Sequence, residues 1–324
     1  MLLESGPACA TVNPDFLADV LAGFAMRPQR AIPARWLYDR RGSELFEAIT
    51  QLPEYYVTRT ETSILERHCG EMGELVGRGR AVIEFGSGSS TKTPILLRCV
   101  EPAAYVPIDI SGDFLRHSAA ALINSFPHLR LMPVEADFMK PFVIPSAARQ
   151  MPKLGFFPGS TIGNMEADVA SSLLRAMRDT LGVGAMLLIG MDRPKDEETL
   201  ISAYDDELGV TAEFNLNLLH RINRELDGDI PVNAFRHVAR WNGWEKRIEM
   251  HLEATRDTTF TINGRLFSVA AGETVHTENS HKYSLDCARL LLKTGGWTPI
   301  CDWTDPSKKF GLILAEAQTT IAAP

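Results

Sequence analysis

The strongest constraint on the fold is the alternation of short apolar segments with longer amphipathic ones in the middle of the chain. Ala81–Phe85, Ala104–Asp109 and Leu154–Phe157 are short and largely apolar, which is typical of strands buried on both faces. Apolar residues recur at helical spacing in Lys92–Cys99 and Phe114–Ser125, which follow the first two of these segments. This alternation predicts an α/β fold in which helices cover both faces of a parallel sheet.

The same pattern predicts further elements of this sheet and helices ahead of it. Leu129–Val134 and Met186–Gly190 have the composition of buried strands. Pro107 lies inside the second strand, where its missing N–H favours a bulge. Helices are expected over three earlier segments: Asp15–Phe24, Ser43–Ile49 and about Thr60–Leu75.

The pattern changes after Asp192. Lys195–Leu226 is predicted to be one helix, largely polar on one face. Strand-like runs follow at Arg247–Thr255 and Thr258–Ala270, and Asn263-Gly264 predicts a hairpin within the second run. Helix and strand patterns then return at the end of the chain, over Leu285–Lys293, Thr298–Trp303 and Gly311–Ala317. We therefore interpret 194–283 as an insertion into the first sheet.

Composition narrows the class of protein. The chain carries 33 Lys and Arg against 41 Asp and Glu, a net charge of −8, which argues against a general nucleic-acid binder. Its five cysteines contain no CxxC pair, so we expect neither a disulfide framework nor a zinc site, and a reducing cytoplasm fits best. No segment has the length and apolarity of a membrane span, and the first residues do not resemble a signal peptide.

A glycine turn follows the first strand, at Gly86-Ser-Gly88. Glycines there allow a ligand to approach the backbone, and the next helix offers free N–H groups at its start. A tight turn can also need glycine for steric reasons alone. The dinucleotide fingerprint GxGxxG would need a third glycine at position 91, where the chain has Thr91, and this counts against NAD or FAD.

Acidic residues follow the next two strands. Asp109 can accept hydrogen bonds from both ribose hydroxyls of a nucleoside, although it could instead cap the following helix. Asp137 and Phe138 offer an acceptor for an exocyclic amine and a ring on which adenine can stack. The fourth strand ends in Gly159-Ser-Thr-Ile-Gly-Asn164, where small residues leave space and the amide offers both a donor and an acceptor. These strand ends are expected to converge at the carboxyl edge of the sheet.

Together these segments resemble the class I S-adenosylmethionine-dependent methyltransferases. More narrowly, from about Pro33 to Leu314 the chain is similar to the histidine-specific Nα-methyltransferases of ergothioneine biosynthesis. The segments that carry this resemblance are Trp36–Asp39, Leu52–Tyr56, Glu84–Gly88, Gly159–Asn164, Ala203–Asp206, Arg247–Met250 and Thr277–Ser280. It implies a class I (Rossmann-like) methyltransferase domain, 58–193 plus 284–324, and a second α+β substrate-binding domain, 1–57 plus 194–283.

The resemblance also implies the site residues. S-adenosylmethionine, which leaves as S-adenosylhomocysteine, would be bound by Tyr38, Gly86, Lys92, Asp109, Asp137, Phe138 and Ser160. L-histidine would be bound by Tyr55, Asn164, Tyr204, Met250, Glu278 and Ser280, with Tyr38 and Asn164 orienting the amine that is methylated. From the sequence alone, Glu278 could be a surface acid, Tyr204 part of a helix surface, Tyr55 a packing residue and Met250 a core residue.

The residue types suit the imidazole ring, which when neutral has one donor and one acceptor nitrogen. Glu278 can accept from the ring N–H, and Ser280, two residues further along a strand, can serve the other nitrogen. A buried carboxylate also disfavours indole or benzyl groups, which would leave it unpaired. The expected reaction is three successive methylations of the α-nitrogen, giving hercynine, by a cytoplasmic monomer that needs no metal.

Three alternatives stay open at this point. The chain could be a methyltransferase for another amino acid or a protein side chain, in which case an indole-accepting pocket should lack the acid at position 278. It could be a Rossmann oxidoreductase, which Thr91 disfavours. It could also be a ligand-binding or scaffold protein without activity, although its cofactor motifs are intact.

Overall fold

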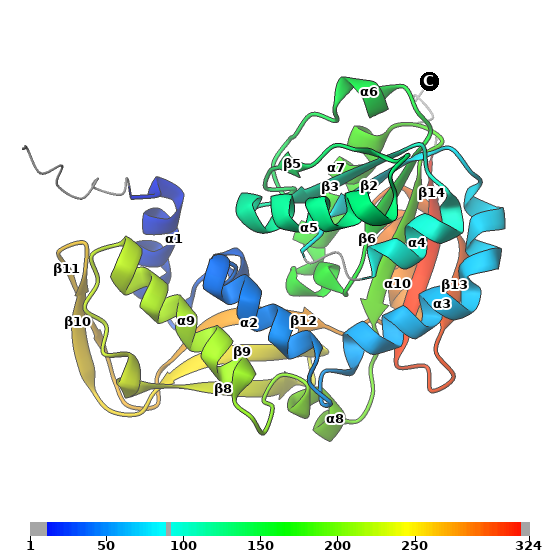
Figure 1. The fold of residues 1–324 in the computed structure, drawn as a ribbon. Helices are drawn as coiled ribbons and strands as arrows, with labels where there is room; N and C mark the ends of the chain where they lie inside the picture. Colours follow the sequence, from blue (N-terminus) through cyan, green and yellow to red (C-terminus); the bar gives the residue numbers. More distant parts are fainter. Residues whose placement is uncertain (1–11, 89–91, 319–324) are drawn as a thin grey trace, which may run out of the picture. The chain divides into compact units, whose positions relative to one another are not determined.

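The computed structural model describes residues 12–88 and 92–318, so Cys9 and Thr91 lie outside the described residues. The chain divides into two compact units. Unit 1 comprises residues up to Phe46, Tyr204–Arg240 and Glu249–Glu278; unit 2 comprises Glu47–Ala203, Trp241–Ile248 and the residues from Asn279 onward. Each unit is described below by itself (Figure 1).

Unit 2 contains a mixed sheet with the strand order β13-β14-β7-β6-β2-β3-β4, and β5 also pairs with β3. Its parallel strands are β2 (Ala81–Phe85), β3 (Ala104–Asp109), β4 (Arg130–Leu131), β5 (Val134–Glu135), β6 (Lys153–Phe157) and β7 (Met186–Asp192). β14 (Phe310–Ala317) runs antiparallel to β7 and to the edge strand β13 (Trp297–Thr304). β2 and β7 are buried almost throughout, as their apolar composition predicts.

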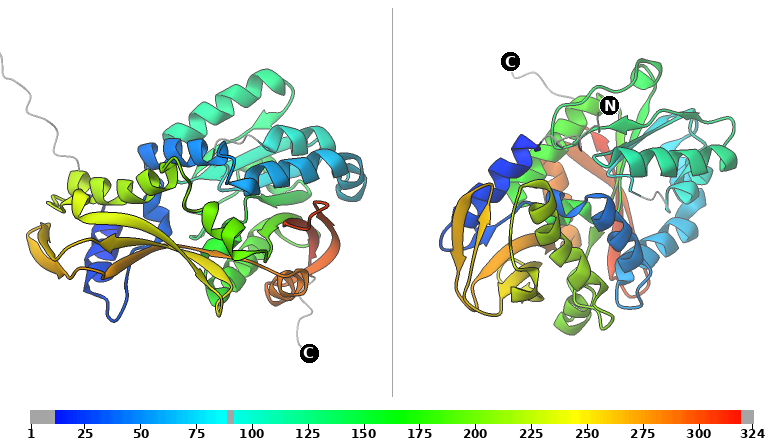
Figure 2. Two further views of the ribbon diagram at one scale, coloured as in Figure 1. Left: turned by 90° about the horizontal axis from the view of Figure 1, so that it is seen from below. Right: turned by 60° about the vertical axis from the view of Figure 1, so that its left-hand side comes forward.

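Helices cover both faces of this sheet (Figures 1 and 2). α3 (Tyr56–Val76) packs on α4 (Thr93–Val100) and contacts β14, and α5 (Gly112–Ser125) packs on β3. α7 (Ala167–Leu181) packs on β6 and on α10 (Leu285–Thr294), which contacts β13. Unit 2 also contains the short α6 (Ser146–Arg149) and α8 (Glu197–Ser202), and the 3-10 turn η2 (Thr161–Asn164). The predicted class I fold, with its doubly covered parallel sheet, is confirmed.

The expected strand Leu129–Val134 is divided into β4 and β5, and the reason lies in the neighbouring strand. β4 pairs with Ala104 and Tyr105, whereas β5 pairs with Ile108 and Asp109. The gap falls opposite Pro107, which has no N–H to give to a neighbour. On its other side Pro107 stays in register with Glu84 of β2, so the predicted bulge in β3 is wrong.

Unit 1 is built around a sheet with the order β1-β12-β9-β8. These strands are β1 (Arg30–Ala31), β8 (Phe235–Asn242), β9 (Arg247–Ala254) and β12 (Thr274–His281), of which the last three continue into unit 2. The predicted hairpin at Asn263-Gly264 is confirmed as β10 (Thr258–Ile262) and β11 (Arg265–Val269). The remaining elements are α1 (Pro14–Ala25), η1 (Ala34–Leu37), α9 (Val210–Glu225) and η3 (Val232–Ala234); α2 (Arg40–Thr50) crosses from unit 1 into unit 2.

The single helix predicted over Lys195–Leu226 is wrong, because the chain forms α8 and α9 with a break between them. Gly209 adopts a left-handed conformation at the start of α9. The carboxylate of Asp206 accepts hydrogen bonds from the backbone N–H groups of Val210 and Thr211, which have no partner within the helix. This cap places Tyr204 in the connection rather than on a helix.

The observed units also differ from the division given above. Residues 47–57, 194–203, 241–248 and 279–283 fall in unit 2, although all of them were assigned to the second domain. The physical reason is that long elements, namely α2 and the strands β8, β9 and β12, run across the boundaries. The functional names of the two domains stay predictions.

The cysteine prediction needs one correction. Cys69 of α3 and Cys99 of α4 form a disulfide, with their Cα atoms 5.1 Å apart. The two helices pack so closely that a Cβ on Gly73 would lie 2.4 Å from the carbonyl oxygen of Cys99. Sequence spacing gave no sign of this pairing, because it arises only when α3 and α4 are packed together.

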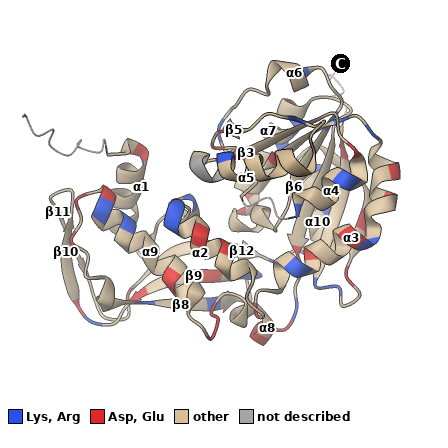
Figure 3. Cartoon of the chain, in the orientation of Figure 1, with Lys and Arg blue, Asp and Glu red and all other residues tan. Residues whose placement is uncertain are grey.

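Within the described ranges, the helices are all too short or too polar to cross a membrane. A search of the same residues for three or more His, Cys, Asp or Glu side chains in metal-binding geometry found no such group. Acidic and basic residues are interspersed along α2 and α9, which Figure 3 shows in red and blue.

Candidate active site

The glycine turn after β2 has the geometry of a backbone cradle. Gly86 adopts a positive φ of 70°, which favours glycine, and its N–H donates to the carbonyl of Ile108 on β3. A Cβ at Gly86 would lie 3.3 Å from the ring of Phe138, so the bare backbone and this aromatic ring are in close contact. Phe138 is held edge-on by Phe157, with ring centroids 5.6 Å apart. A planar ligand group and a backbone-contacting group could therefore bind side by side here.

Asp109 lies at the end of β3, and its carboxylate accepts hydrogen bonds from the glycine turn after β2 and from the turn before α5. One oxygen accepts from the N–H of Gly88 at 3.0 Å and the other from the N–H of Ser111 at 2.9 Å. Burial raises the pKa of Asp109, and these backbone hydrogen bonds oppose that shift. The bond to Ser111 is the local role considered above, and the bond to Gly88 aligns the carboxylate with the glycine turn.

Glu84 stands two residues before Gly86 and is fully buried. Its carboxylate accepts hydrogen bonds from Thr93 Oγ1 at 2.8 and 3.0 Å and from Tyr105 Oη at 2.5 Å. Burial raises the pKa of Glu84 to about 7, although the two hydroxyl donors and Lys92 act in the opposite direction. Glu84 thus joins β2, β3 and the start of α4 beneath the glycine turn.

The raised pKa of Glu84 predicts a pH-dependent stability. The Glu84 carboxyl is protonated at a higher pH in the folded protein than in the unfolded chain. The contribution of this protonation to the free energy of unfolding is therefore complete below pH 4.5 and is lost as the pH rises to about 7. The loss corresponds to about 3 kcal/mol of unfolding free energy. We expect Glu84→Gln to remove this dependence, measured by urea unfolding at pH 5 and pH 7.

The difference between variant and wild type is the informative quantity in this experiment. The pKa of His251 in unit 1 is lowered to about 4, mainly by burial, so its contribution changes with pH in the opposite direction. His251 is the same in both proteins and cancels. Parallel curves for wild type and Glu84→Gln would show that Glu84 does not titrate in this range.

The partly buried Lys92 forms an ion pair with Glu61 of α3, whose side chain is fully buried. The same carboxylate accepts from the N–H of Gly159 at 3.0 and 3.1 Å. The structure therefore places Lys92 between α3 and the glycine-rich loop after β6. Its charge is already paired in this arrangement, and its role toward a ligand stays a prediction.

The loop after β6 contains Ser160 and Asn164, and at Gly163 it contacts the end of β12. Ser160 has a positive φ of 62° and is buried, and its hydroxyl accepts from the N–H of Asp192 at 2.9 Å. A Cβ at Gly163 would lie 2.9 Å from the carbonyl oxygen of His281, so η2 packs directly against the segment that follows Ser280.

Asp192, at the end of β7, is the centre of a buried cluster of charges in unit 2. Its carboxylate pairs with Lys195 Nζ at 2.6 Å and Lys282 Nζ at 2.8 Å, and it accepts from Tyr56 Oη at 2.6 Å. The two lysines hold the pKa of Asp192 below its usual range despite burial, whereas burial lowers the pKa of Lys195 to about 8. Lys282 Nζ also donates to Ser280 Oγ at 2.7 Å.

In unit 1, the structure brings Tyr38 and Glu278 together. The Tyr38 hydroxyl donates to Glu278 Oε1 at 3.3 Å, and the Tyr38 ring packs edge-on against Phe214 and Phe46. Glu278 is 8% exposed, so it is not a surface acid. Glu278 and Ser280 are both buried on β12, whereas Asn279 between them is partly exposed and donates to Glu166, as the strand alternation predicts.

Tyr204 and Met250 are also buried in unit 1. The carbonyl oxygen of Tyr204 bonds His237 Nε2 at 2.7 Å, which identifies that nitrogen as the protonated one. The Met250 carbonyl accepts from Thr277 Oγ1 at 3.1 Å, next to Glu278 along β12. Burial agrees with a core position for the Met250 side chain.

Tyr55 and Asp137 complete the predicted set, and both lie in unit 2. Tyr55 is buried just before α3, where its carbonyl accepts from Arg59 Nη1 at 3.3 Å. The Asp137 carboxylate accepts from the N–H of Met139 at 2.9 Å, and this bond forms a local turn around Phe138, the residue between them. Their roles toward ligands stay predictions.

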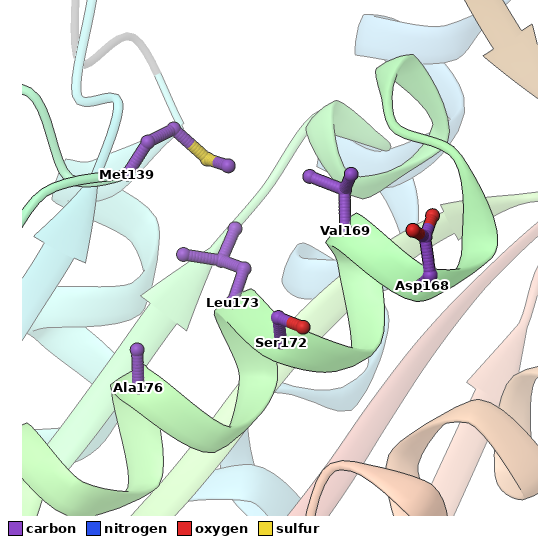
Figure 4. A pocket seen from close by; sticks show the side chains of 6 residues that line it. All are labelled: Met139, Asp168, Val169, Ser172, Leu173 and Ala176. Carbon is purple, nitrogen blue, oxygen red and sulfur yellow. The ribbon is translucent and has the colours of Figure 1, made fainter.

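A separate depression of about 230 Å³ lies on α7 and is shown in Figure 4. It is lined by Met139, Asp168, Val169, Ser172, Leu173 and Ala176. None of these six belongs to the predicted site, and the two polar ones, Asp168 and Ser172, do not form a cluster that would select a ligand.

Comparison with known proteins decides the family. The model of the histidine-specific, S-adenosylmethionine-dependent methyltransferases matches residues 16–317. The chain belongs to this family. The histidine N-alpha-methyltransferase of Mycolicibacterium smegmatis is 40% identical over 304 residues, which cover 92% of this chain and 93% of that protein. That of Mycobacterium tuberculosis is 39% identical with the same coverage. Ergothioneine biosynthesis protein 1 of Neurospora crassa is 31% identical over 90% of this chain and 34% of that longer protein.

Sequence reasoning missed several buried residues that contact the predicted site residues Lys92, Ser160 and Ser280. Asp192 had a recognisable signal, because it ends an apolar strand as Asp109 does. Glu61 stands on the apolar face of α3, three and four residues before Ile64 and Leu65, where an acid needs a partner. Lys282 gave no comparable signal, since its partner lies far away in the sequence.

Proposed function

We propose that this chain transfers methyl groups from S-adenosylmethionine to the α-amino nitrogen of L-histidine. Three successive transfers give hercynine, the first step of ergothioneine biosynthesis. The observation that carries the proposal is the match of almost the whole chain to a histidine-specific family. The burial of Glu278, the residue proposed to accept from the imidazole, supports it. The Tyr38 hydroxyl donates to one oxygen of this carboxylate, and a carboxylate can accept several hydrogen bonds, so the ring N–H of histidine suits it as a further donor.

The cofactor fits the residues at the carboxyl edge of the sheet in unit 2. The bare backbone at Gly86, its contact with the Phe138 ring and the adjacent Asp109 carboxylate suit an adenosine group. Asp109 would accept from the ribose hydroxyls, and Asp137 and Phe138 would hold the adenine. Lys92, Ser160 and Tyr38 complete the proposed set. The bound cofactor supplies an electrophilic methyl group on a sulfonium.

The proposed roles of the substrate residues follow from their chemistry. Asn164 and Tyr204 hold the carboxylate and amine end of histidine, and Tyr55 and Met250 line the ring. Glu278 accepts from one ring nitrogen and Ser280 donates to the other.

Catalysis in this proposal depends mainly on alignment. The amine must be neutral to attack, and Tyr38 and Asn164 orient its lone pair toward the methyl group. The positive charge of the sulfonium disappears during transfer, so fixed dipoles suit the site better than a strong anion beside it. The amine needs space around it, because it carries three methyl groups at the end.

A competition assay tests the substrate. The purified protein is incubated with S-adenosylmethionine and an equimolar mixture of the twenty amino acids, and the products are measured by mass spectrometry. We expect methylated histidine alone. Methylation of a different amino acid would refute the roles of Glu278 and Ser280, and no methylation with intact cofactor binding would favour a protein side chain or another small molecule.

We also propose that the enzyme acts as a cytoplasmic monomer. Light scattering of the purified protein at micromolar concentration should give the mass of one chain, 35.8 kDa. A mass twice as large would contradict the monomer.

A further inference from the structure

The Asp192 cluster contains a hydrogen bond whose direction is fixed by chemistry. Lys282 Nζ lies 2.7 Å from Ser280 Oγ, and an ammonium group can only donate. Ser280 therefore accepts in this bond, and its own hydroxyl hydrogen must be directed to a different acceptor. A serine without such a neighbour could rotate and serve as donor or acceptor.

Burial and an ion pair hold the Lys282 ammonium in its position beside Ser280. The side chains of Lys282 and Asp192 are both fully buried, and the 2.8 Å ion pair holds the ammonium in place. Asp192 is itself fixed, because it also bonds Lys195 and Tyr56, and its backbone N–H bonds Ser160. A second point of attachment is the N–H of Lys282, which donates to the carbonyl of Lys246 at 2.8 Å. The position of the ammonium beside Ser280 is thus held by a network of ion pairs and hydrogen bonds in unit 2.

We propose that Lys282, anchored by Asp192, is a positioning residue that makes Ser280 an obligatory donor and thereby selects a ring with an unprotonated nitrogen. This inference rests on the proposed function, in which Ser280 faces the imidazole. A neutral imidazole offers an acceptor to Ser280. An imidazolium ring or an indole would place an N–H donor opposite the Ser280 hydroxyl hydrogen, so no hydrogen bond could form. The positive charge of an imidazolium would also be repelled by Lys282.

The matched variants Lys282→Met and Lys282→Gln separate this role from simple packing. Both replacements are unbranched and uncharged and have similar volume, but only glutamine can donate to Ser280. We expect Lys282→Met to raise KM for histidine about 10-fold with little change in kcat, and Lys282→Gln to restore KM to within about 3-fold of wild type. Equal KM values for the two variants would overturn the proposal.

A double variant tests whether Lys282 acts through Ser280. If it does, Ser280→Ala combined with Lys282→Met should be no worse than Ser280→Ala alone. Losses that multiply in the double variant would overturn the proposal. The dissociation constant of S-adenosylhomocysteine should stay within about 2-fold in every variant, since the inferred effect is on the ring of the amino acid.

Wild-type protein provides a test that does not depend on the folding of a variant. Thiazol-4-yl-alanine and thiazol-5-yl-alanine each place one unprotonated nitrogen at one of the two imidazole positions, and thien-3-yl-alanine has none. We expect one thiazole to inhibit histidine methylation about 10-fold more tightly than the thiophene. Equal inhibition by all three would overturn the proposal.

The two proposals fail in distinguishable ways. If wild-type protein does not methylate histidine on the α-nitrogen, the proposed function is wrong. If it does, and the Met and Gln variants or the three analogues do not differ, only the role of Lys282 is wrong.

Discussion

Replacing Glu278 by alanine is expected to lower kcat/KM for histidine about 100-fold. Glu278 is buried on β12 and bonds the Tyr38 hydroxyl, so the substitution removes a charged acceptor from a desolvated position. A hydrogen bond to a charged group contributes about 1.5–3 kcal/mol, which corresponds to roughly 10- to 150-fold. Steady-state kinetics with histidine as the varied substrate measures the effect.

The same variant should discriminate less against other aromatic amino acids. The phenylalanine ring offers the carboxylate of Glu278 no hydrogen-bond donor in the wild type, and in the alanine variant this mismatch no longer exists. The control is Asn279→Ala, which changes the adjacent residue on the opposite face of β12. A loss of equal size in the control, or an unchanged preference for histidine in Glu278→Ala, would contradict the assigned role.

Replacing Asp109 by alanine is expected to weaken the binding of S-adenosylhomocysteine about 100-fold. The substitution removes an acceptor for two ribose hydroxyls and leaves the N–H groups of Gly88 and Ser111 without their carboxylate. Two hydrogen bonds to a charged group would together account for at least ~3 kcal/mol of cofactor binding. The loss of the acceptor for two partly buried N–H groups would destabilise the fold by about 1 kcal/mol. Isothermal titration calorimetry and urea unfolding measure the two effects.

Asp179→Ala is the matched control for this second variant. It changes the net charge by the same amount, but Asp179 is exposed in the last turns of α7 and contacts Arg178 only at the surface. Its effect on stability should lie within about 0.5 kcal/mol, and cofactor affinity should not change. Cofactor affinity in Asp109→Ala within 3-fold of wild type would rule out the ribose role.

The fold was predictable where the sequence pattern is local. β2, β3 and β7 are short apolar runs, and their burial follows directly from that composition. β8 was missed because His237 occupies one of its buried positions, between the exposed Arg236 and half-buried Val238, which hides the alternation. The sequence did contain a signal for the break before α9, because Asp206 can cap a helix and Gly209 can adopt a left-handed conformation. The long helical pattern on both sides obscured this signal.

Part of the geometry around the predicted cofactor residues was also predictable, whereas the roles of these residues toward ligands stay predictions. Topology places Gly86, Asp109 and Phe138 at one edge of the sheet, and the structure shows the contact between Gly86 and Phe138 and the bond from Gly88 to Asp109. The buried pairs Glu61–Lys92 and Asp192–Lys282 join residues that are distant in the sequence. Such pairs depend on tertiary packing, and a single sequence contains no pattern that reports them.

The central claim is methyl transfer to the α-nitrogen of histidine, and the position of the methyl group tests it most directly. Purified protein is incubated with histidine and S-adenosylmethionine carrying a deuterated methyl group, and the product is fragmented in a tandem mass spectrometer. The account predicts three labelled methyl groups, all lost with the α-amine and none on the imidazole fragment. Label on the imidazole ring would contradict it, because Glu278 and Ser280 are assigned to the ring nitrogens.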